Sequence, residues 1–267
     1  MEGSMQHAGG TEVTFWGTGD SMGVPRVYCD CAVCTEARRG GSNRRTRSLV
    51  HLSDPSYGTM LIDCGPDWRS QMEAANMRHI DKMLLTHAHF DHIAGLAEWA
   101  DSCRWLNRRG EAYAKAEVIA EIVNRFPWLE RNIAFKPIDE PFNLGAWKIT
   151  CWKVNHGKNG ISFAFRFDHE AAGKAWVYCP DAINLTPEQL APMHDLQLLI
   201  LGASFYQEPY PMETRSVYDV TEACELFGKL QPERMLLTHM SHDIDIRRDY
   251  SLPAAVSFAK AGLQVVV

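Results

Sequence analysis

The sequence lacks the features of several large classes of protein. Its longest apolar runs, such as residues 196–201, are far too short to cross a bilayer. No basic segment followed by an apolar one opens the chain, so we expect no secretory signal. The net charge of −6 leaves no basic surplus, which argues against a generic nucleic-acid-binding protein. These absences favour a cytoplasmic globular protein that does not span a membrane.

The sequence also gives no sign of an oxidising compartment, in which its eight cysteines would form disulfides. Without a secretory signal, we expect free thiols in a reducing compartment. No segment is rich enough in proline, glycine or serine to separate two domains. We therefore expect a single domain over residues 11–267, after a disordered leader or tag at residues 1–10. A truncation after residue 267 stays open.

The sequence does contain alternating strand and helix patterns, in a composition that is 46% hydrophobic and 22% charged. Apolar runs bounded by turn residues predict strands at 11–17, 48–52, 59–62, 82–86, 147–154, 162–167, 175–179, 198–201 and 234–238. Helical patterns lie at 67–76, 96–106, 112–126, 187–193 and 216–227. This interleaving predicts a layered α/β protein with its helices outside.

The strongest chemical signal lies directly after the apolar residues 83–85, where His87, His89, Asp91 and His92 follow one another closely. Side chains alternate along an extended segment, so His87 and His89 point to the same side. Imidazole nitrogens and carboxylate oxygens suit zinc, manganese or iron. Because the sequence then turns helical, Asp91 and His92 can reach a second position. We interpret the segment as part of two metal sites, with Asp91 also a candidate catalytic residue.

Three further candidate ligands each follow a predicted strand: His156, Asp181 and His239. α/β proteins place their sites at the carboxyl ends of strands, so we expect these side chains to meet the histidine motif. A separate cluster, Cys-x-Cys-x2-Cys at residues 29–34, brings three thiolates into one loop. With a distant fourth ligand it would hold a structural zinc. Three free surface thiols are the alternative.

Together these motifs resemble the metallo-β-lactamase superfamily. The resemblance rests on Thr-His-x-His-x-Asp-His at residues 86–92, followed by the three later ligands in order, and it covers nearly the whole chain. It implies a four-layer αββα sandwich with a dinuclear metal site. By resemblance, one metal is held by His87, His89 and His156, and the other by Asp91, His92 and His239, with Asp181 as the bridge. Asp63 matches an aspartate that orients a ligand or loop from behind the site.

The glycine-rich residues 17–25, followed by the cysteine cluster, are similar to the PhnP branch of this superfamily. That branch consists of phosphodiesterases that open phosphoribosyl cyclic phosphates. By resemblance, His242 completes the structural zinc site with Cys29, Cys31 and Cys34. The PqqB group shares the glycine-rich start and the cysteine loop but lacks the full histidine set. We therefore expect a metal-dependent phosphodiesterase that acts on a small cyclic phosphodiester through a hydroxide bridging two metals.

One departure concerns the proton donor. PhnP and tRNase Z relatives carry a histidine in a His-x3-Thr element, whereas this chain has Val217 and Thr221 there. Asp219, Tyr218 or a metal-bound water are candidate replacements, and Asp219 is our tentative catalytic residue. The missing histidine also raises the alternative of a lactone, ester or thioester hydrolase. A PqqB-like cofactor-biosynthesis metalloprotein or an iron oxygenase is the alternative of another class.

The expected cofactors are two divalent ions in the active site, zinc or manganese with iron as a further option, and one structural zinc. The expected partner is a small phosphorylated substrate, and a homodimer stays open. Bidentate contacts from Arg44, Arg45 or Arg47 to a phosphate are one interpretation of the basic segment. A solvated basic loop beside the zinc is the other.

Overall fold

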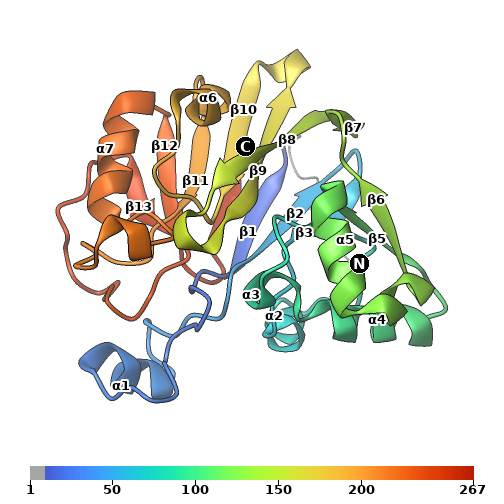
Figure 1. The fold of residues 1–267 in the computed structure, drawn as a ribbon, viewed down its shortest axis with the longest axis horizontal. Helices are drawn as coiled ribbons and strands as arrows, with labels where there is room; N and C mark the ends of the chain where they lie inside the picture. Colours follow the sequence, from blue (N-terminus) through green and yellow to red (C-terminus); the bar gives the residue numbers. More distant parts are fainter. Residues whose placement is uncertain (1–9) are drawn as a thin grey trace, which may run out of the picture.

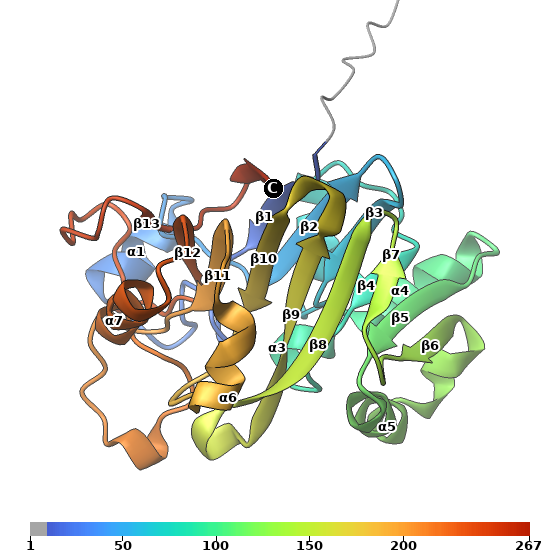
Figure 2. The same ribbon diagram turned by 90° about the horizontal axis from the view of Figure 1, so that it is seen from above.

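The computed structural model describes residues 10–267, so the leader expected at residues 1–10 lies almost wholly outside the described residues. Two seven-stranded sheets face each other, and helices cover their outer sides (Figure 1; Figure 2). The predicted four-layer αββα sandwich is therefore confirmed. Among the described residues, no helix is long and apolar enough to cross a membrane.

The first sheet has the strand order β14-β1-β2-β3-β4-β5-β6. Its strands are β14 (Gln264–Val266), β1 (Glu12–Gly17), β2 (Leu49–Asp54), β3 (Gly58–Ile62), β4 (Lys82–Leu84), β5 (Gly110–Ala114) and β6 (Ile133–Pro137). The helices α2 (Trp68–Ala74), α3 (Phe90–Ile93), α4 (Leu96–Trp105) and α5 (Ala116–Arg125) connect its parallel strands. From β3 to β6 the strands run parallel, so their carboxyl ends meet at one edge.

The second sheet has the order β13-β12-β11-β10-β9-β8-β7. Its strands are β13 (Val256–Phe258), β12 (Arg234–Thr238), β11 (Leu198–Gly202), β10 (Lys174–Cys179), β9 (Ile161–His169), β8 (Trp147–Asn155) and β7 (Phe142–Leu144). The helices α6 (Pro187–Leu190) and α7 (Val220–Leu230) belong to this half. Strands β10 to β13 run parallel, which again gathers their carboxyl ends at one edge.

Alternation along β10 shows how the two cores form. Trp176 and Tyr178 belong to the core between the sheets, whereas Val177 and Cys179 pack in the core under α7. Successive side chains of a strand point to opposite faces, so one buried strand contributes to both cores. The ring of Trp176 stacks on Phe167 of the neighbouring strand β9, with ring centroids 3.9 Å apart, and this pair stabilises the second sheet.

The helix predicted at residues 112–126 is wrong in its first part. Strand β5 takes residues 110–114 and pairs with β4 and β6, and α5 begins only at Ala116. Buried Ala112 and Ala114 alternate with partly exposed Glu111 and Tyr113, which is a strand period, although alanine favours helices. Pairing on both sides overrides the local preference. Strands β6, β7, β13 and β14 were not predicted.

The cysteine segment was predicted as a loop, but it includes the start of helix α1 (Ala32–Arg38). Cys31 is the N-cap of this helix, and its Sγ accepts a hydrogen bond from Cys34 N at 3.4 Å. In Figure 1, α1 lies apart from the two sheets, at the lower left. The cap places Cys31 and Cys34 on the same turn, so that both thiols face one point.

Candidate metal centre

The turn after β3 shapes the segment that carries the histidine motif. Asp63 has a φ of 64°, and its carboxylate accepts hydrogen bonds from Thr86 N and Thr86 Oγ1, both at 2.9 Å. A Cβ atom on Gly65 would lie 2.2 Å from the carbonyl oxygen of Asp91, so only glycine fits. Residues 63–65 thus hold the histidine motif in place through their contacts with Thr86 and Asp91.

The first group of candidate ligands is His87, His89 and His156, whose ligand atoms lie within 4.8 Å of one another. His87 Nε2 and His89 Nδ1 are 2.8 Å apart, as expected for two side chains that point the same way from an extended segment. The Nδ1 of His156 donates to the carbonyl of Ser216 at 2.7 Å. That hydrogen bond leaves Nε2 of His156 free to face the centre.

The second group is Asp91, His92 and His239, again within 4.8 Å. Asp91 and His92 lie in the short helix α3, which begins directly after His89, and His239 follows β12. Asp181 lies between the two groups. Its carboxylate oxygens are 3.0 Å from His92 Nε2, 3.2 Å from His239 Nε2 and 3.7 Å from His156 Nε2. The structure thus brings all seven expected side chains together around one centre.

Asp63 completes the arrangement from behind, since the Nδ1 of His92 donates to its carboxylate at 2.7 Å. Both side chains are fully buried. A carboxylate on Nδ1 fixes the histidine tautomer that presents an unprotonated Nε2 to a metal. The structure therefore places Asp63 where the sequence led us to expect it.

Burial and neighbouring charges shift the pKa values of the candidate ligands. Burial lowers the pKa of His87 well below its usual value, and also lowers the pKa of His89 and His156. Burial opposes ionisation of Asp181, but His239 and His92 hold its pKa well below the usual range. Burial also opposes the charge of His92 and His239, but Asp91 and Asp181 outweigh it and raise the pKa of both imidazoles. These two histidines must therefore release a proton when a divalent cation binds, whereas the first three are already neutral.

Two buried polar atoms of the centre give a second reason why these side chains suit a metal ion. His92 Nε2 and Asp181 Oδ2 are buried and lie 3.0 Å apart, but neither atom forms a hydrogen bond of good geometry with a described residue. Buried polar atoms without a hydrogen bond are costly, and a cation bound by both atoms would satisfy them. Five imidazoles with two nearby carboxylates form a ligand set for zinc, manganese or iron, and not for calcium.

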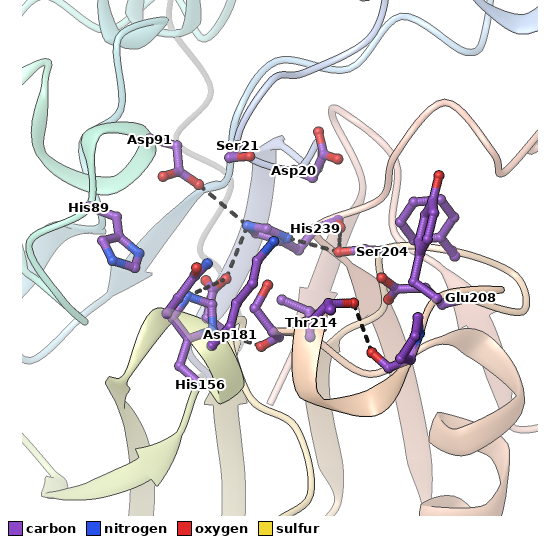
Figure 3. A pocket seen from close by; sticks show the side chains of 17 residues that line it. Asp20, Ser21, His89, Asp91, His156, Asp181, Ser204, Glu208, Thr214 and His239 are labelled. Atoms are coloured by element: carbon purple, nitrogen blue, oxygen red, sulfur yellow. Dashed lines mark hydrogen bonds and ion pairs between the residues drawn. The ribbon is translucent and has the colours of Figure 1, made fainter.

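A cavity of about 550 Å³ opens onto this centre. Asp91, His156, Asp181 and His239 point toward a shared space in Figure 3, with Glu208 and Thr214 on the other side of the cavity. The remaining wall is partly apolar and includes Phe205, Tyr210 and Val217. Val217 therefore does line the cavity, at the position where the family resemblance led us to expect a histidine.

The structure does not support Asp219 or Tyr218 as the proton donor. The Asp219 carboxylate caps helix α7 and accepts hydrogen bonds from Glu222 N at 2.9 Å, Thr221 Oγ1 at 2.6 Å and Glu208 N at 3.0 Å. It does not line the cavity. Tyr218 is buried, and its hydroxyl accepts from Leu185 N at 2.8 Å. Both side chains are occupied with structural hydrogen bonds, so neither is placed to protonate a leaving group.

The arginine segment also lies outside the main cavity. Arg45 is buried and donates to the carbonyl oxygens of Ser241 and Ile244, both at 2.8 Å. Arg47 pairs with Asp67 at 3.1 Å. The interpretation that these residues hold the substrate phosphate at the metals is therefore wrong.

Sequence reasoning missed Lys158, the one lysine or arginine among the described residues that line the cavity. Its position two residues after His156 was the available signal.

The cysteine cluster gathers as expected. Cys29, Cys31, Cys34 and His242 have ligand atoms within 4.8 Å of one another. His242 Nδ1 lies 3.3 Å from Cys34 Sγ and 3.6 Å from Cys31 Sγ. His242 is only three residues after His239, so one short segment serves both sites. A set of three thiols and one imidazole is typical of a structural zinc.

Comparisons with known proteins agree with this geometry. Residues 59–240 match the β-lactamase superfamily domain. The chain is 26% identical over 264 residues to an octanoyltransferase of Porphyromonas gingivalis, covering 94% of this chain and 50% of that protein. It is 34% identical over 95 residues to coenzyme PQQ synthesis protein B of Methylorubrum extorquens, covering 32% of each. The chain thus spans half or less of these relatives.

Among solved structures, the chain is similar to a diphosphatase of the PhnP family, with a TM-score of 0.82, 26% identity and coverage of 96% of this chain and 97% of that one. Zinc-bound PqqB of Methylobacterium extorquens gives a TM-score of 0.78 at 19% identity, covering 95% and 99%, and shows the fold alone. Superfamily membership implies metallo-hydrolase chemistry with a divalent metal. The chain belongs to the β-lactamase superfamily and has the metallo-β-lactamase fold.

Proposed function

We propose that the protein hydrolyses a small phosphodiester, preferably a cyclic one, with two divalent metal ions. The observation that carries the proposal is the convergence of seven ligand side chains on one centre at the end of a 550 Å³ cavity. Similarity to a PhnP-family diphosphatase over nearly the whole chain supports a phosphorus-centred reaction.

The residues of the centre have separate parts in this proposal. His87, His89 and His156 would hold one ion, and Asp91, His92 and His239 would hold the other, with Asp181 between them. When bound, a pair of divalent ions neutralises the charge of a phosphoryl group and activates water as a nucleophile. Asp63 and the carbonyl of Ser216 fix the tautomers of His92 and His156.

The cavity adds the means to recognise an anion. Lys158 supplies a positive charge at its wall, and Phe205 and Tyr210 supply an aromatic surface for an organic group. Val217 places an apolar side chain where a proton donor would stand. We therefore expect a substrate whose leaving group needs little protonation, such as a phenolate or a strained ring alkoxide.

We also propose that Cys29, Cys31, Cys34 and His242 bind a structural zinc. The site would hold helix α1 against the segment that carries His239. Because that segment also supplies a ligand of the first centre, loss of this zinc would disturb the active site as well.

Hydrolysis of bis(p-nitrophenyl) phosphate and of a ribose cyclic phosphate by protein loaded with zinc or manganese tests the proposal. We expect turnover that is abolished by Asp181→Asn, which removes the shared carboxylate charge, and unchanged by Asp168→Asn on the surface of β9. No turnover of either compound by the metal-loaded protein would refute it.

A second candidate is hydrolysis of an acyl thioester or a related ester. It is favoured by the match of 94% of the chain to half of an octanoyltransferase, and by the apolar cavity wall formed by Phe205, Tyr210 and Val217. The same activated water could attack a carbonyl carbon. Comparing kcat/KM for octanoyl thioesters and for phosphodiesters on one metal-loaded sample separates the two.

A further inference from the structure

We infer that the protein has a second, basic pocket, distinct from the metal centre, that binds the phosphate group of a small phosphate ester or free phosphate. This pocket of about 300 Å³ lies where the segment joining α1 to β2 meets the residues after His242 and the β13–β14 connection. Its lining includes Thr18, Ser42, Arg44, Arg45, Ile246 and Lys260. No acidic side chain among the described residues lines it.

Arg45 is the unusual member of this pocket, because it is a buried cation without a carboxylate partner. It is 4% exposed. Its guanidinium donates only to neutral oxygens, namely Asn43 Oδ1 at 3.2 Å and the carbonyls of Ser241 and Ile244 at 2.8 Å. Its Nε is buried without any partner among the described residues. A buried charge of this kind is costly unless a counter-charge approaches it.

The nearby carboxylates are already engaged with other cations. Asp245 pairs with Arg247 at 2.6 Å and accepts a hydrogen bond from Asn43 Nδ2. Asp20 pairs with Arg26 at 2.5 Å. Neither lies within ion-pair distance of Arg45. Both carboxylates act on Arg45 only at longer range, and burial still lowers the pKa of Arg45 to about 10 against their effect, so its charge is only partly compensated.

Two further cations at the pocket are also unpaired. Arg44 and Lys260 are exposed, and neither forms an ion pair within residues 10–267. Three positive charges without a direct ion pair among the described residues thus meet at one pocket of a chain whose net charge is −6, and Arg247, which pairs with Asp245, also lines the pocket. Such a concentration of one sign attracts an anion to this place and not to the surface in general.

The geometry favours a tetrahedral oxyanion. Guanidinium groups donate paired hydrogen bonds that match phosphate oxygens, and an ammonium adds a third donor. Ile246 and Ala259 give the pocket an apolar side that suits a short organic group. The volume lies at the lower end of small-molecule pockets, which fits a phosphorylated metabolite rather than a polymer.

Occupancy of this pocket would reach the metal centre through Arg45. Its guanidinium donates to the carbonyls of Ser241 and Ile244, which lie on either side of His242 in the segment after His239. An anion that fixes Arg45 would therefore also stabilise the segment at residues 239–246. We therefore expect the backbone amides of residues 239–246 to exchange hydrogen more slowly when phosphate is bound.

Isothermal titration calorimetry of metal-loaded protein with inorganic phosphate and ribose 5-phosphate, at constant ionic strength, tests the inference. The variant is Arg44→Gln with Lys260→Gln, two exposed positions outside the metal centre. The matched control is Arg69→Gln with Lys229→Gln, which removes the same charge from exposed positions on α2 and α7. We expect the first pair to weaken one of two phosphate-binding events by about tenfold or more, and the control to leave both unchanged.

Hydrogen exchange provides the second readout, with phosphate-dependent protection of residues 239–246 in wild type and control but not in the Arg44/Lys260 variant. Tighter binding of ribose 5-phosphate assigns the site to an ester, and equal binding assigns it to free phosphate. A single binding event of equal affinity in all three proteins would place phosphate at the metal centre alone and overturn the inference. Binding of a single-stranded oligonucleotide, with no small phosphate bound, would overturn it too.

Discussion

Replacing Asp63 by asparagine tests how the protein prepares its metal centre. The side chain is fully buried, accepts from Thr86 N at 2.9 Å and accepts from His92 Nδ1 at 2.7 Å. Asparagine keeps the size and tolerates the φ of 64°. Its amide oxygen stays with Thr86 N, which can only donate, so its NH2 group must face His92.

Two donors then oppose each other, and His92 must take the other tautomer, with the proton on Nε2. A protonated Nε2 cannot bind a metal. The lost hydrogen bond is charge-assisted and contributes about 2 kcal/mol, which corresponds to about 30-fold in affinity. We expect the metal held by Asp91, His92 and His239 to bind about 30-fold more weakly, and the metal at His87, His89 and His156 to be little affected.

The assay is competition with a calibrated chelator, read by elemental analysis. Asp54→Asn is the matched control, because Asp54 is also a buried, hydrogen-bonded carboxylate but lies at the far end of the β2–β3 hairpin. If each of the two metals binds to Asp63→Asn as tightly as to the wild type, the carboxylate does not set the tautomer of His92, and the reasoning fails.

Three further predictions follow from single side chains. Gly65→Ala should destabilise the fold by about 1–3 kcal/mol in thermal unfolding and lower the metal content, because its Cβ meets the Asp91 carbonyl at 2.2 Å; an unchanged melting temperature would contradict the close approach. Asp219→Ala should lower the free energy of unfolding by about 1–2 kcal/mol through loss of the α7 cap, while kcat stays within about twofold; a kcat loss of the size typical for general acids, about 100-fold, would restore Asp219 as the proton donor. Lys158→Gln should raise KM for anionic substrates more than it lowers kcat in steady-state assays, and a pure kcat effect would show a different role.

The metal centre was predictable because its ligands follow strands that the sequence marks clearly. Residues 83–85, 175–179 and 235–237 are apolar runs that belong to parallel strands, and the carboxyl ends of parallel strands meet at one edge of a sheet. His156 instead follows β8, which is antiparallel to its neighbours. The grouping into two sets came from family resemblance, and the structure brings the same side chains together.

The failures have a common physical cause, since they concern contacts that no local pattern encodes. Ala112 and Ala114 favour helix locally, but pairing with two neighbouring strands decides their conformation. Asp219 was taken as a catalytic residue because it lies near the missing histidine in sequence. The capping box Asp219-x-x-Glu222 was visible in the sequence and indicates its structural role. The burial of Arg45 depends on carbonyls almost 200 residues away, which sequence spacing cannot show.

Stepwise reconstitution with metal links the occupancy of the histidine and aspartate centre to catalysis. Metal-free protein is titrated with zinc or manganese while bound metal and hydrolysis of bis(p-nitrophenyl) phosphate are measured on the same samples. We expect three bound ions per chain, one of which is lost when Cys29, Cys31 and Cys34 are replaced by serine. We expect phosphodiesterase activity to appear with the two ions of the histidine and aspartate centre. Activity in the metal-free protein, or full occupancy of that centre without phosphodiester turnover, would contradict this expectation.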